Sequence, residues 1–311
     1  MSPPAEITAS RKTGRARGYI DWYRPQQRTL DLLNDANCVL EEYRKLWPLT
    51  ARQIFYRLIG AYGYDKSDAF YSKLCHHLAN ARRAKAIPFH AIRDDGVTTY
   101  AMEHFADADA FRAMVRTKAE TYRRDLMARQ AVHVEVWCEA AGMVPQLTSV
   151  TDDYSIRAYS SSGFDSLTAK KNLADRICRI GKPAAILHLG DYDPSGQSMF
   201  TVITEDVGAF VMADRLNALV NVYFRRVALT EDQVAAYGLP TAPASTKDSR
   251  SKSWKGETCQ LEALAPDQIA RLLTEAIVEI VDTDQMNAEL EEEEFERRQL
   301  TRLLPAPGDA A

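Results

Sequence analysis

Several features are scarce or missing in this chain of 311 residues. Its five cysteines are scattered, odd in number and without Cys-x-x-Cys spacing, so neither a disulfide framework nor a zinc site is expected. No apolar run approaches the roughly eighteen residues that a membrane-spanning helix needs. The first residues, Met1–Glu6, lack the basic and apolar regions of a signal peptide. A Gly-rich ATP-binding motif is also missing. These absences predict a cytoplasmic protein without a membrane segment.

Charge is distributed unevenly along the chain. Residues 1–130 hold 22 Lys and Arg against 15 Asp and Glu, a net charge of +7, whereas residues 131–311 hold 17 against 28, a net charge of −11. Lys and Arg are the main ligands of DNA phosphates, and carboxylates are ligands of hard metal ions. The asymmetry favours a DNA-contacting module followed by a metal-binding module, with ordinary charged surfaces as the alternative.

Two aspartates follow a strongly apolar segment. Residues 184–189 are mostly apolar and are ended by a glycine, which is typical of a strand buried on both faces of a parallel sheet. Asp191 and Asp193 follow in the sequence G-D-Y-D-P-S-G, where both carboxylates can point to one site. The carboxyl ends of parallel strands are where α/β proteins bind ligands, and carboxylate oxygens suit Mg²⁺ or Mn²⁺. The alternative is a polar turn with two solvated acids.

A second predicted strand also ends in an acid. Residues 132–138 alternate β-branched and polar side chains and lead into Glu139, which a helix-like run follows. Strand-Glu-helix, then strand-G-D-x-D-P-x-G about fifty residues later, resembles a TOPRIM domain. The form G-D-Y-D-P-S-G is similar to that of the topoisomerase VI A subunit and of the related meiotic double-strand-break transesterase. The resemblance implies that Glu139, Asp191 and Asp193 bind Mg²⁺, with Mn²⁺ as a second possibility.

Residues 51–59 have the apolar periodicity of a helix. Thr50 is a suitable N-cap and Gly60 a suitable stop. Phe55 falls on the apolar side, whereas Arg52 and Tyr56, four residues apart, fall together on its flank. The pattern predicts an amphipathic helix in which Tyr56 need not be buried.

The neighbouring segments predict a helix-turn-helix of the winged-helix kind. One helix is expected from about Gln26 until before Pro48, and another over residues 67–86. The outward face of the latter is basic and contains His76, Arg82, Arg83 and Lys85. Residues 87–92, with the turn at 94–96, are expected to form the wing.

The sequence L-T-A-R-Q-I-F-Y-R extends the resemblance to the topoisomerase VI A family. It resembles the R-x-I-Y-Y motif of that family's winged-helix domain, in which the second aromatic residue is the nucleophile. By position, Arg52 matches the arginine, Phe55 the first aromatic residue and Tyr56 the attacking tyrosine. Phenylalanine departs from the family's tyrosine at a position that does not react. The short chain is similar to the stand-alone "Mini-A" proteins of prokaryotes and mobile elements, which implies a nucleoid-associated protein.

The resemblance implies an enzyme like the A subunit of a type IIB DNA topoisomerase, which cleaves double-stranded DNA by Mg²⁺-dependent transesterification. Tyr56 is then the nucleophile that ends in a 5′-phosphotyrosyl link, and Arg52 stabilises negative charge near it. The expected DNA contacts are Arg57, Arg82, Arg83 and Lys85. In the family, the tyrosine of one protomer meets the metal of another, which implies a homodimer. Strand passage would need a separate GHKL-type ATPase subunit, and the alternative is that it does not occur.

The expected order is a flexible basic arm over residues 1–25, a winged-helix (CAP-like) domain over residues 26–125 and a Rossmann-like TOPRIM domain over residues 126–311. The last domain has a parallel sheet and a C-terminal helical extension. Two other functions stay open. One is a TOPRIM nuclease that hydrolyses DNA with a metal-bound water. The other is a non-catalytic winged-helix DNA-binding protein whose acids are structural.

Two further strands and one further acid are expected near the site. Residues 156–159 and 220–224 predict strands, and Arg225 and Arg226 follow the second. Both arginines are candidate DNA contacts. Glu262 is a candidate acid behind the metal ligands, and the start of a helix is the alternative explanation for it.

The remaining segments carry less information. The small-residue loop at 160–163 and the basic loop at 241–255 are candidate phosphate contacts, with simple turns and exposed loops as the alternatives. Residues 289–298 predict a charged helix with a solvated face or a coiled contact. His133 and His188 lie on predicted strands and favour hydrogen-bonded core positions over metal ligation.

Overall fold

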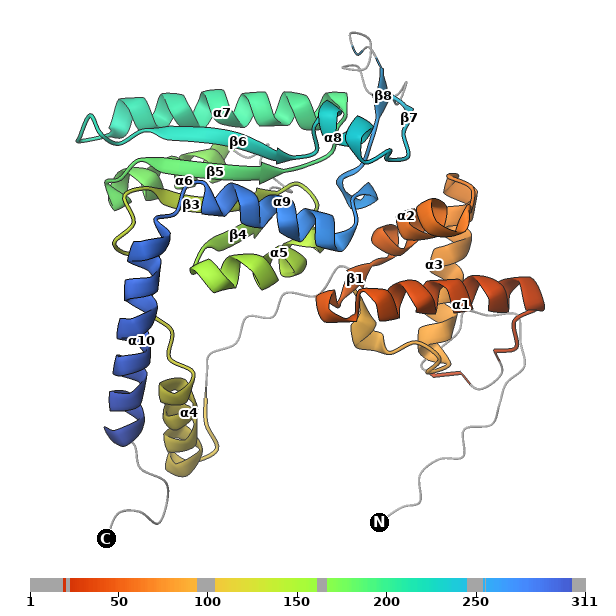
Figure 1. The fold of residues 1–311 in the computed structure, drawn as a ribbon, viewed down its shortest axis with the longest axis horizontal. Helices are drawn as coiled ribbons and strands as arrows, with labels where there is room; N and C mark the ends of the chain where they lie inside the picture. Colours follow the sequence, from red (N-terminus) through yellow and green to blue (C-terminus); the bar gives the residue numbers. More distant parts are fainter. Residues whose placement is uncertain are drawn as a thin grey trace.

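The computed structural model describes residues 19–20, 23–93, 104–160, 167–244, 254 and 256–303. Figure 1 shows a larger half built on a sheet and a smaller, helical half that precedes it in the chain. Most of the predicted basic arm, the wing turn at 94–96 and most of the loops at 160–163 and 241–255 lie outside the described residues.

A four-stranded parallel sheet forms the centre of the larger half. The strands are β3 (His133–Cys138), β4 (Arg157–Ser160), β5 (Ala184–Leu189) and β6 (Val222–Ala228). Their spatial order is β4-β3-β5-β6, and every pair is parallel. The chain moves outward from β3 to β4 and then crosses to β5 on the other side of β3. Because the order reverses there, a crevice is expected at the carboxyl ends of β3 and β5. The predicted α/β class with a parallel sheet is confirmed.

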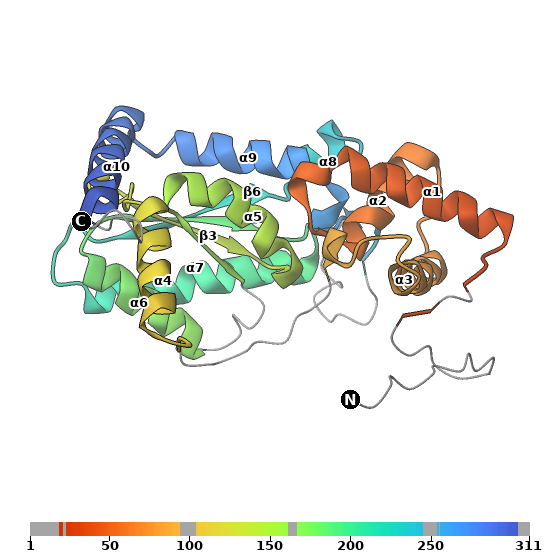
Figure 2. The same ribbon diagram turned by 90° about the horizontal axis from the view of Figure 1, so that it is seen from below.

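Helices cover both faces of the sheet, as Figures 1 and 2 show. They are α5 (Val144–Thr151) and α9 (Pro266–Val278) on one face and α6 (Leu167–Ile180) and α7 (Pro194–Asp214) on the other. Successive strand side chains point to opposite faces. Val134 and Val136 therefore pack in the core that contains α5 and α9, whereas Trp137 packs in the core that contains α6 and α7.

Three helices of the smaller half lie at the carboxyl edge of the sheet. They are α1 (Gln27–Glu42), α2 (Ala51–Tyr62) and α3 (Asp68–Arg83). Thr50 caps α2 as predicted, because its hydroxyl accepts the Gln53 N–H while the Gln53 side chain accepts the Thr50 N–H. The helix passes Gly60 and ends at Gly63, whose φ of 70° suits glycine. The predicted stop at Gly60 is therefore three residues early.

The short elements are η1 (Arg44–Leu46), β1 (Leu49–Thr50), η2 (Phe89–Ala91), β2 (Ile92–Arg93), η3 (Ala141–Met143), η4 (Asp152–Tyr154), α8 (Glu231–Ala236), β7 (Ala242–Pro243), β8 (Glu257–Thr258) and η6 (Leu261–Ala263). β1 and β2 pair in parallel, and β7 and β8 pair antiparallel. Within the described residues, the segment predicted to be a wing is thus a 3-10 turn followed by a short parallel strand.

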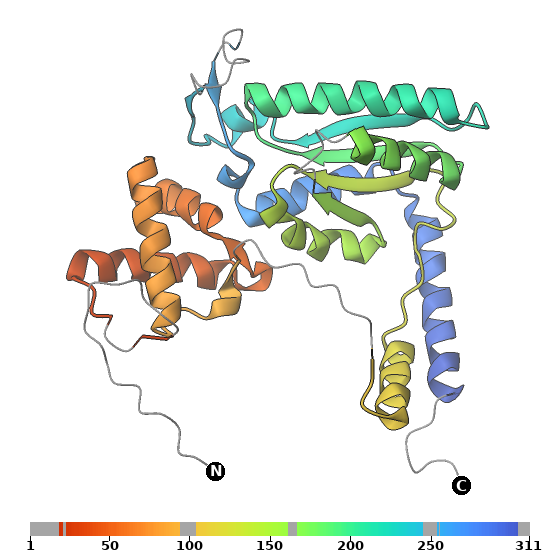
Figure 3. The same ribbon diagram turned by 180° about the vertical axis from the view of Figure 1, so that it is seen from behind.

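A helical pair projects from the sheet half (Figures 1 and 3). It consists of α4 (Ala108–Glu120) and α10 (Thr283–Leu303). Arg124 donates to Glu289 and Glu296, and its own N–H donates to Glu293 at 2.7 Å. Glu289 and Glu293 are only 1% and 4% exposed. The side of α10 that carries them is therefore an ion-paired contact and not a solvated face. α4, predicted to belong to the first domain, packs here against α10.

One hydrophobic core joins the two halves of the molecule. It contains Leu49, Ile54 and Leu58 from the smaller half together with Val136 and Leu187 from the sheet. All five side chains are fully buried. The two halves therefore share one continuous core.

The two longest described helices, α7 and α10, have 21 residues each. α10 is densely charged, and α7 carries Glu205, Asp206 and Asp214. Among the helices that the structure describes, none is both long and apolar enough to cross a membrane.

A buried carboxylate fixes β3 against α6. Glu135 is fully buried and accepts from Arg176 at 2.7 and 2.8 Å, from Trp137 at 3.0 Å and from His133 at 3.0 Å. Burial by itself raises the pKa of Glu135, but the hydrogen bonds from Arg176 and His133 outweigh it and hold the pKa below its ordinary value. The carboxylate is therefore charged and fully hydrogen-bonded.

Replacing Arg176 with methionine should destabilise the fold, because Glu135 keeps its charge but loses its bidentate partner. We expect a loss of about 3–5 kcal/mol in the free energy of unfolding, measured in urea. Arg179→Met is the control, since Arg179 is exposed one helical turn later and its loss should cost less than about 0.5 kcal/mol. Equal losses in the two variants would refute this account.

Candidate functional site

The three predicted acids lie at the carboxyl edge of the sheet. Glu139 follows β3 directly, and its N–H donates to the Leu189 carbonyl of β5 at 2.9 Å. The Asp191 N–H donates to Glu139 Oε2 at 3.1 Å. Asp193 caps α7, since its Oδ1 accepts the Gly196 N–H at 2.7 Å. The fold therefore brings the acids to the carboxyl edge of the sheet, next to the ends of the neighbouring strands β3 and β5.

Two glycines allow this close packing. A Cβ atom on Gly190 would lie 2.6 Å from Glu139 Oε2 and 2.9 Å from His188 Cε1. A Cβ atom on Gly196 would lie 2.6 Å from the Asp191 carbonyl oxygen. Residues 190–193, which contain Asp191 and Asp193, form the acidic loop. Any larger residue at Gly190 or Gly196 would push this loop away from Glu139.

Arg226 holds the acidic loop from β6. Its guanidinium donates to the carbonyl oxygens of Asp191, Gly196 and Leu229, the last two at 3.3 Å. Burial lowers the pKa of Arg226, and the nearby acids oppose that effect. Arg226 was predicted to follow a strand and contact DNA; instead β6 extends to Ala228 and the side chain supports the site from inside. β6 was predicted too short because its second half contains two arginines.

Like charges are crowded together at this edge. Burial, with the charges of Asp191 and Asp193, raises the pKa of Glu139 to about 7. Burial likewise raises the pKa of Asp191, although the Leu261 N–H, which donates to its Oδ1 at 2.8 Å, opposes this. Glu262 is 9% exposed, and burial followed by the charge of Asp191 raises its pKa to about 7. A cation is the partner that such a cluster of carboxylates favours.

The tyrosine predicted as nucleophile lies on α2 with its hydroxyl directed to the sheet half. Tyr56 donates to Gln260 Oε1 at 2.7 Å. The sequence predicted that this side chain, on the flank of the apolar face, need not be buried. It is only 3% exposed, because Phe55 and Lys66 pack against its ring and Gln260 covers the hydroxyl. Burial raises the pKa of the Tyr56 phenol above its ordinary value, and Arg52 opposes this rise.

Two cations stand beside the tyrosine. The Arg52 guanidinium lies 5.2 Å from the Tyr71 ring centre. Burial by itself lowers the pKa of Arg52, but the charge of Glu262 and the Tyr71 hydroxyl outweigh it and raise the pKa. Lys66 Nζ lies 5.6 Å from the Tyr56 ring centre and donates to the Pro240 carbonyl at 2.8 Å. Both cations can neutralise negative charge that enters here.

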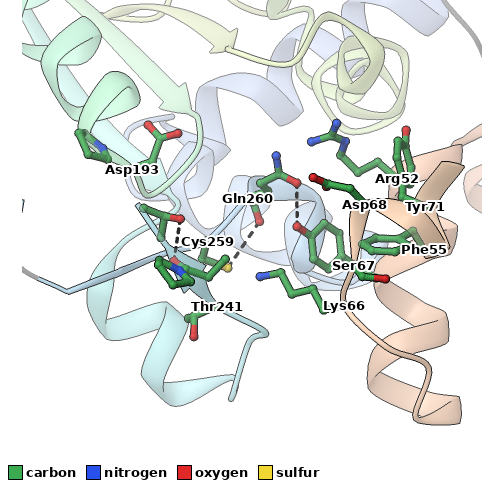
Figure 4. Close-up of a pocket in the computed structure, with 15 residues that line it drawn as sticks. Arg52, Phe55, Lys66, Ser67, Asp68, Tyr71, Asp193, Thr241, Cys259 and Gln260 are labelled. Carbon is green, nitrogen blue, oxygen red and sulfur yellow. Dashed lines mark hydrogen bonds between the residues drawn. The ribbon is translucent and has the colours of Figure 1, made fainter. Parts of the chain in front are cut away.

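A cleft of about 710 Å³ lies between the tyrosine and Asp193. Its walls include Arg52, Tyr56 and Lys66 from the smaller half and Asp193 and Gln260 from the sheet half. Figure 4 shows Asp193 on one side of the cleft, Arg52 and Tyr71 on the other, and Gln260 between them. One chain therefore presents a phenol, two cations and an acid to one space.

Residues 259–263 connect the tyrosine to the acids. Cys259 exchanges backbone hydrogen bonds of 2.8 and 2.9 Å with Tyr192, which lies between the two aspartates. The next two residues hold the Tyr56 hydroxyl and Asp191 Oδ1, and the Ala263 carbonyl accepts from Arg57. Sequence reasoning did not find this segment, apart from Glu262, since its role depends on contacts with residues far away in the chain.

The structure places the four predicted DNA contacts in two separate regions. Arg57 donates to the Ala263 carbonyl and so links the two halves. Arg82, Arg83 and Lys85 lie at the carboxyl end of α3, whereas its amino end lines the cleft. Tyr71 on α3 also lines the cleft, and Arg82 and Arg83 follow it by eleven and twelve residues, which is about 17–18 Å along the helix axis.

The two histidines on strands differ in their hydrogen bonding. His133 is hydrogen-bonded to Glu135 at 3.0 Å, as a structural histidine should be. His188 is 3% exposed, and its Nδ1 is buried without a hydrogen-bond partner. Burial, followed by the charge of Arg226, lowers the pKa of His188 to about 3, so the ring is neutral.

The chemistry of the acidic edge suits a hard metal ion. Its donors are carboxylate oxygens, and Mg²⁺ commonly binds one or two carboxylates together with water and phosphate oxygens. Glu139 and Asp191 are adjacent; burial, followed by the charges of neighbouring aspartates, raises both pKa values, and a bound cation would offset that effect. Among the residues that the structure describes, no three or more His, Cys, Asp or Glu side chains converge as a metal-binding group. The assignment of Mg²⁺ therefore stays a prediction.

Comparisons with known proteins do not place the chain in a family. No protein-family model, no curated protein and no solved structure matches it. Its function must therefore be inferred from the residues of the cleft and their geometry.

Replacing Gly196 with alanine should disturb the acidic loop. The new Cβ would meet the Asp191 carbonyl at 2.6 Å, so we expect a loss of about 1–3 kcal/mol in the free energy of unfolding. Gly208→Ala, on the same helix, is the control: nothing lies within 4 Å of its Cβ, and we expect a gain of about 0.5–1 kcal/mol. Thermal and urea unfolding measure both, and a neutral Gly196→Ala would contradict the packing described here.

Mg²⁺ should stabilise the folded chain if the acidic edge binds it. At a concentration 100 times the dissociation constant, the gain is about 2.7 kcal/mol in the free energy of unfolding. Glu139→Gln should reduce this gain, because it removes one of the two adjacent donors. Glu205→Gln, an exposed position on α7, should leave the gain unchanged. A gain that persists in full after Glu139→Gln would place the metal elsewhere.

Proposed function

We propose that this protein is a DNA-cleaving transesterase in which Tyr56 is the nucleophile, similar in activity to the A subunit of a type IIB topoisomerase. The observation that carries the proposal is the cleft of about 710 Å³, which Tyr56 and Arg52 share with Asp193. A winged-helix-like half and a TOPRIM-like half would supply the two sides of this cleft. The order of the strands and the position of the acids support that interpretation.

The chemistry is an exchange of phosphate esters. The Tyr56 oxygen attacks the phosphorus of a DNA phosphodiester, the phosphorus–oxygen bond to the 3′ oxygen breaks, and a 5′-phosphotyrosyl ester forms. The phenol proton passes to solvent, and the 3′ oxygen takes up a proton as it leaves. Arg52 and Lys66 neutralise the negative charge that the phosphate brings into the cleft. One ester replaces another, so religation requires no ATP.

Glu139 and Asp191, with Asp193 beside them, are the residues that would hold Mg²⁺ or Mn²⁺. When bound, the ion supplies charge neutralisation at the phosphate and at the leaving oxygen. Arg226 and the Leu261 N–H keep the acidic loop in place for this role. Glu262 lies behind the acids and interacts electrostatically with both Asp191 and Arg52.

One observation favours a second function, hydrolysis of DNA. Burial raises the pKa of Tyr56, and Gln260 accepts the hydrogen of its hydroxyl, so the phenol is not activated as it stands. In a TOPRIM-like nuclease, water would attack the phosphate and Tyr56 would be a wall of the cleft. The two functions share the acids and differ only in the nucleophile.

Supercoiled plasmid with Mg²⁺ or Mn²⁺ separates these functions. Transesterification gives cuts whose 5′ ends carry covalently bound protein, and Tyr56→Phe should reduce them below detection because it removes the attacking oxygen. Tyr64→Phe is the control, since that hydroxyl is bound to Asp35 outside the cleft wall and its loss should not affect the adducts. Free ends that persist in Tyr56→Phe and vanish in Asp191→Ala would establish the nuclease instead. A mobility shift without cuts would exclude both activities.

A further inference from the structure

A second recess lies at the amino ends of β3 and β4, away from the cleft. It has a volume of about 470 Å³, and its lining includes His133, the first residue of β3, and Arg157, the first residue of β4. The acids follow the carboxyl ends of the strands, and Glu139 lies six residues beyond His133, which is roughly 20 Å along the strand. This recess, which we call the amino-end pocket, is therefore a separate site.

Separate elements bring basic side chains to the amino-end pocket. Arg157 on β4 is in register with Glu135 on β3, so both side chains point to the same face of the sheet. Arg176 on α6 binds Glu135 on that face, and Arg179, three residues later, lies on the same side of the helix. The charged side chains that line the pocket are four cations and two acids, with a net charge of +2: Arg157, Arg176, Arg179, Lys182, Asp125 and Glu135.

The acids offset only part of this positive charge. Arg176 binds both oxygens of Glu135, at 2.7 and 2.8 Å, so these two charges neutralise each other. Asp125 is exposed and accepts the N–H of Met127 at 3.0 Å. Arg157 and Arg179 are exposed, and within the described part of the chain neither forms an ion pair. Two guanidinium groups can therefore receive an anionic ligand.

Lys182 is held at the pocket by two backbone carbonyls. Its ammonium group donates to the Ala128 oxygen at 2.6 Å and to the Gln130 oxygen at 2.9 Å. A lysine ammonium has three N–H donors and these contacts use two, so one donor remains. Neutral carbonyls do not cancel its charge. Lys182 is thus a preorganised cation in the same pocket as the two arginines.

The remaining walls of the pocket are less polar. Tyr159 and Ile180 line it, and Ile180 is 37% exposed. The Tyr159 ring is stacked on Trp137, with ring centres 4.7 Å apart, and the Arg176 guanidinium lies 4.8 Å from the centre of the same ring. These contacts hold the Tyr159 ring in place. Apolar walls with a small number of placed polar groups are typical of sites for small molecules.

We propose that the amino-end pocket binds a small phosphate monoester. Arg157 and Arg179 bind the phosphate group through paired N–H donors, and Lys182 adds a third positive charge. The less polar body of the ligand lies against Tyr159 and Ile180. The volume of about 470 Å³ suits a small molecule, whereas duplex DNA would only cover the mouth of the pocket. This proposal does not depend on the DNA cleavage proposed for the cleft.

Calorimetric titration of the full chain with deoxyadenosine monophosphate tests this proposal. We expect one molecule bound per chain, and no binding of deoxyadenosine, which lacks the phosphate. Arg157→Gln combined with Arg179→Gln should weaken binding about tenfold or more, because it removes the paired donors. The matched control combines Arg28→Gln with Arg302→Gln. It removes two exposed charges outside the pocket and should leave the dissociation constant unchanged.

Equal affinities in the two double variants, or no binding by the unaltered chain, would overturn the proposal. A loss of binding after Arg52→Gln, with the pocket variant unaffected, would assign the phosphate to the cleft instead. If deoxyadenosine monophosphate does not bind but the pocket variant alone loses affinity for a short DNA duplex, the arginines belong to a DNA-binding surface. Thermal unfolding confirms that each variant is folded before it is titrated.

Discussion

The contact between residues 259–263 and both sides of the cleft is the constraint on which the site depends. The backbone of this segment pairs with Tyr192 and donates to Asp191, its glutamine holds Tyr56, and its last carbonyl holds Arg57. This short segment, which ends in the 3-10 turn η6, can do this because the Leu261 N–H and the Ala263 carbonyl bond outward and not within the turn.

The order of the strands in the sheet decides where the acids lie. β3 and β5 are neighbours in space although an entire strand and two helices separate them in the chain, so Glu139 and Asp191 become adjacent. Parallel strands end at the same edge, and helix α7 begins there with Asp193 as its cap. The site is therefore a product of strand order, and Arg226 on β6 adds a buried cation that holds the loop.

The site concentrates buried charge, which costs free energy that the surrounding packing must offset. Asp191 repels both Glu139 and Glu262, while Arg52 and Arg226 are themselves partly removed from water. Away from the site, buried charges are paired, as Glu135 is with Arg176. The contrast sets the cleft apart, because unneutralised carboxylates are typical of places that receive a cation.

The sequence by itself determined the local features. The apolar run before Asp191 and the alternation before Glu139 predicted two strands that end in acids, and Thr50 predicted the start of α2, because each pattern depends on residues a few positions apart. Only the tertiary structure decided that Tyr56 is buried under Gln260, that Arg226 supports the acids from within and that Glu289 pairs with Arg124. The partners in each case are about thirty to two hundred residues apart. Periodicity carries no information about such contacts, since they follow from which surfaces come together when the two halves pack.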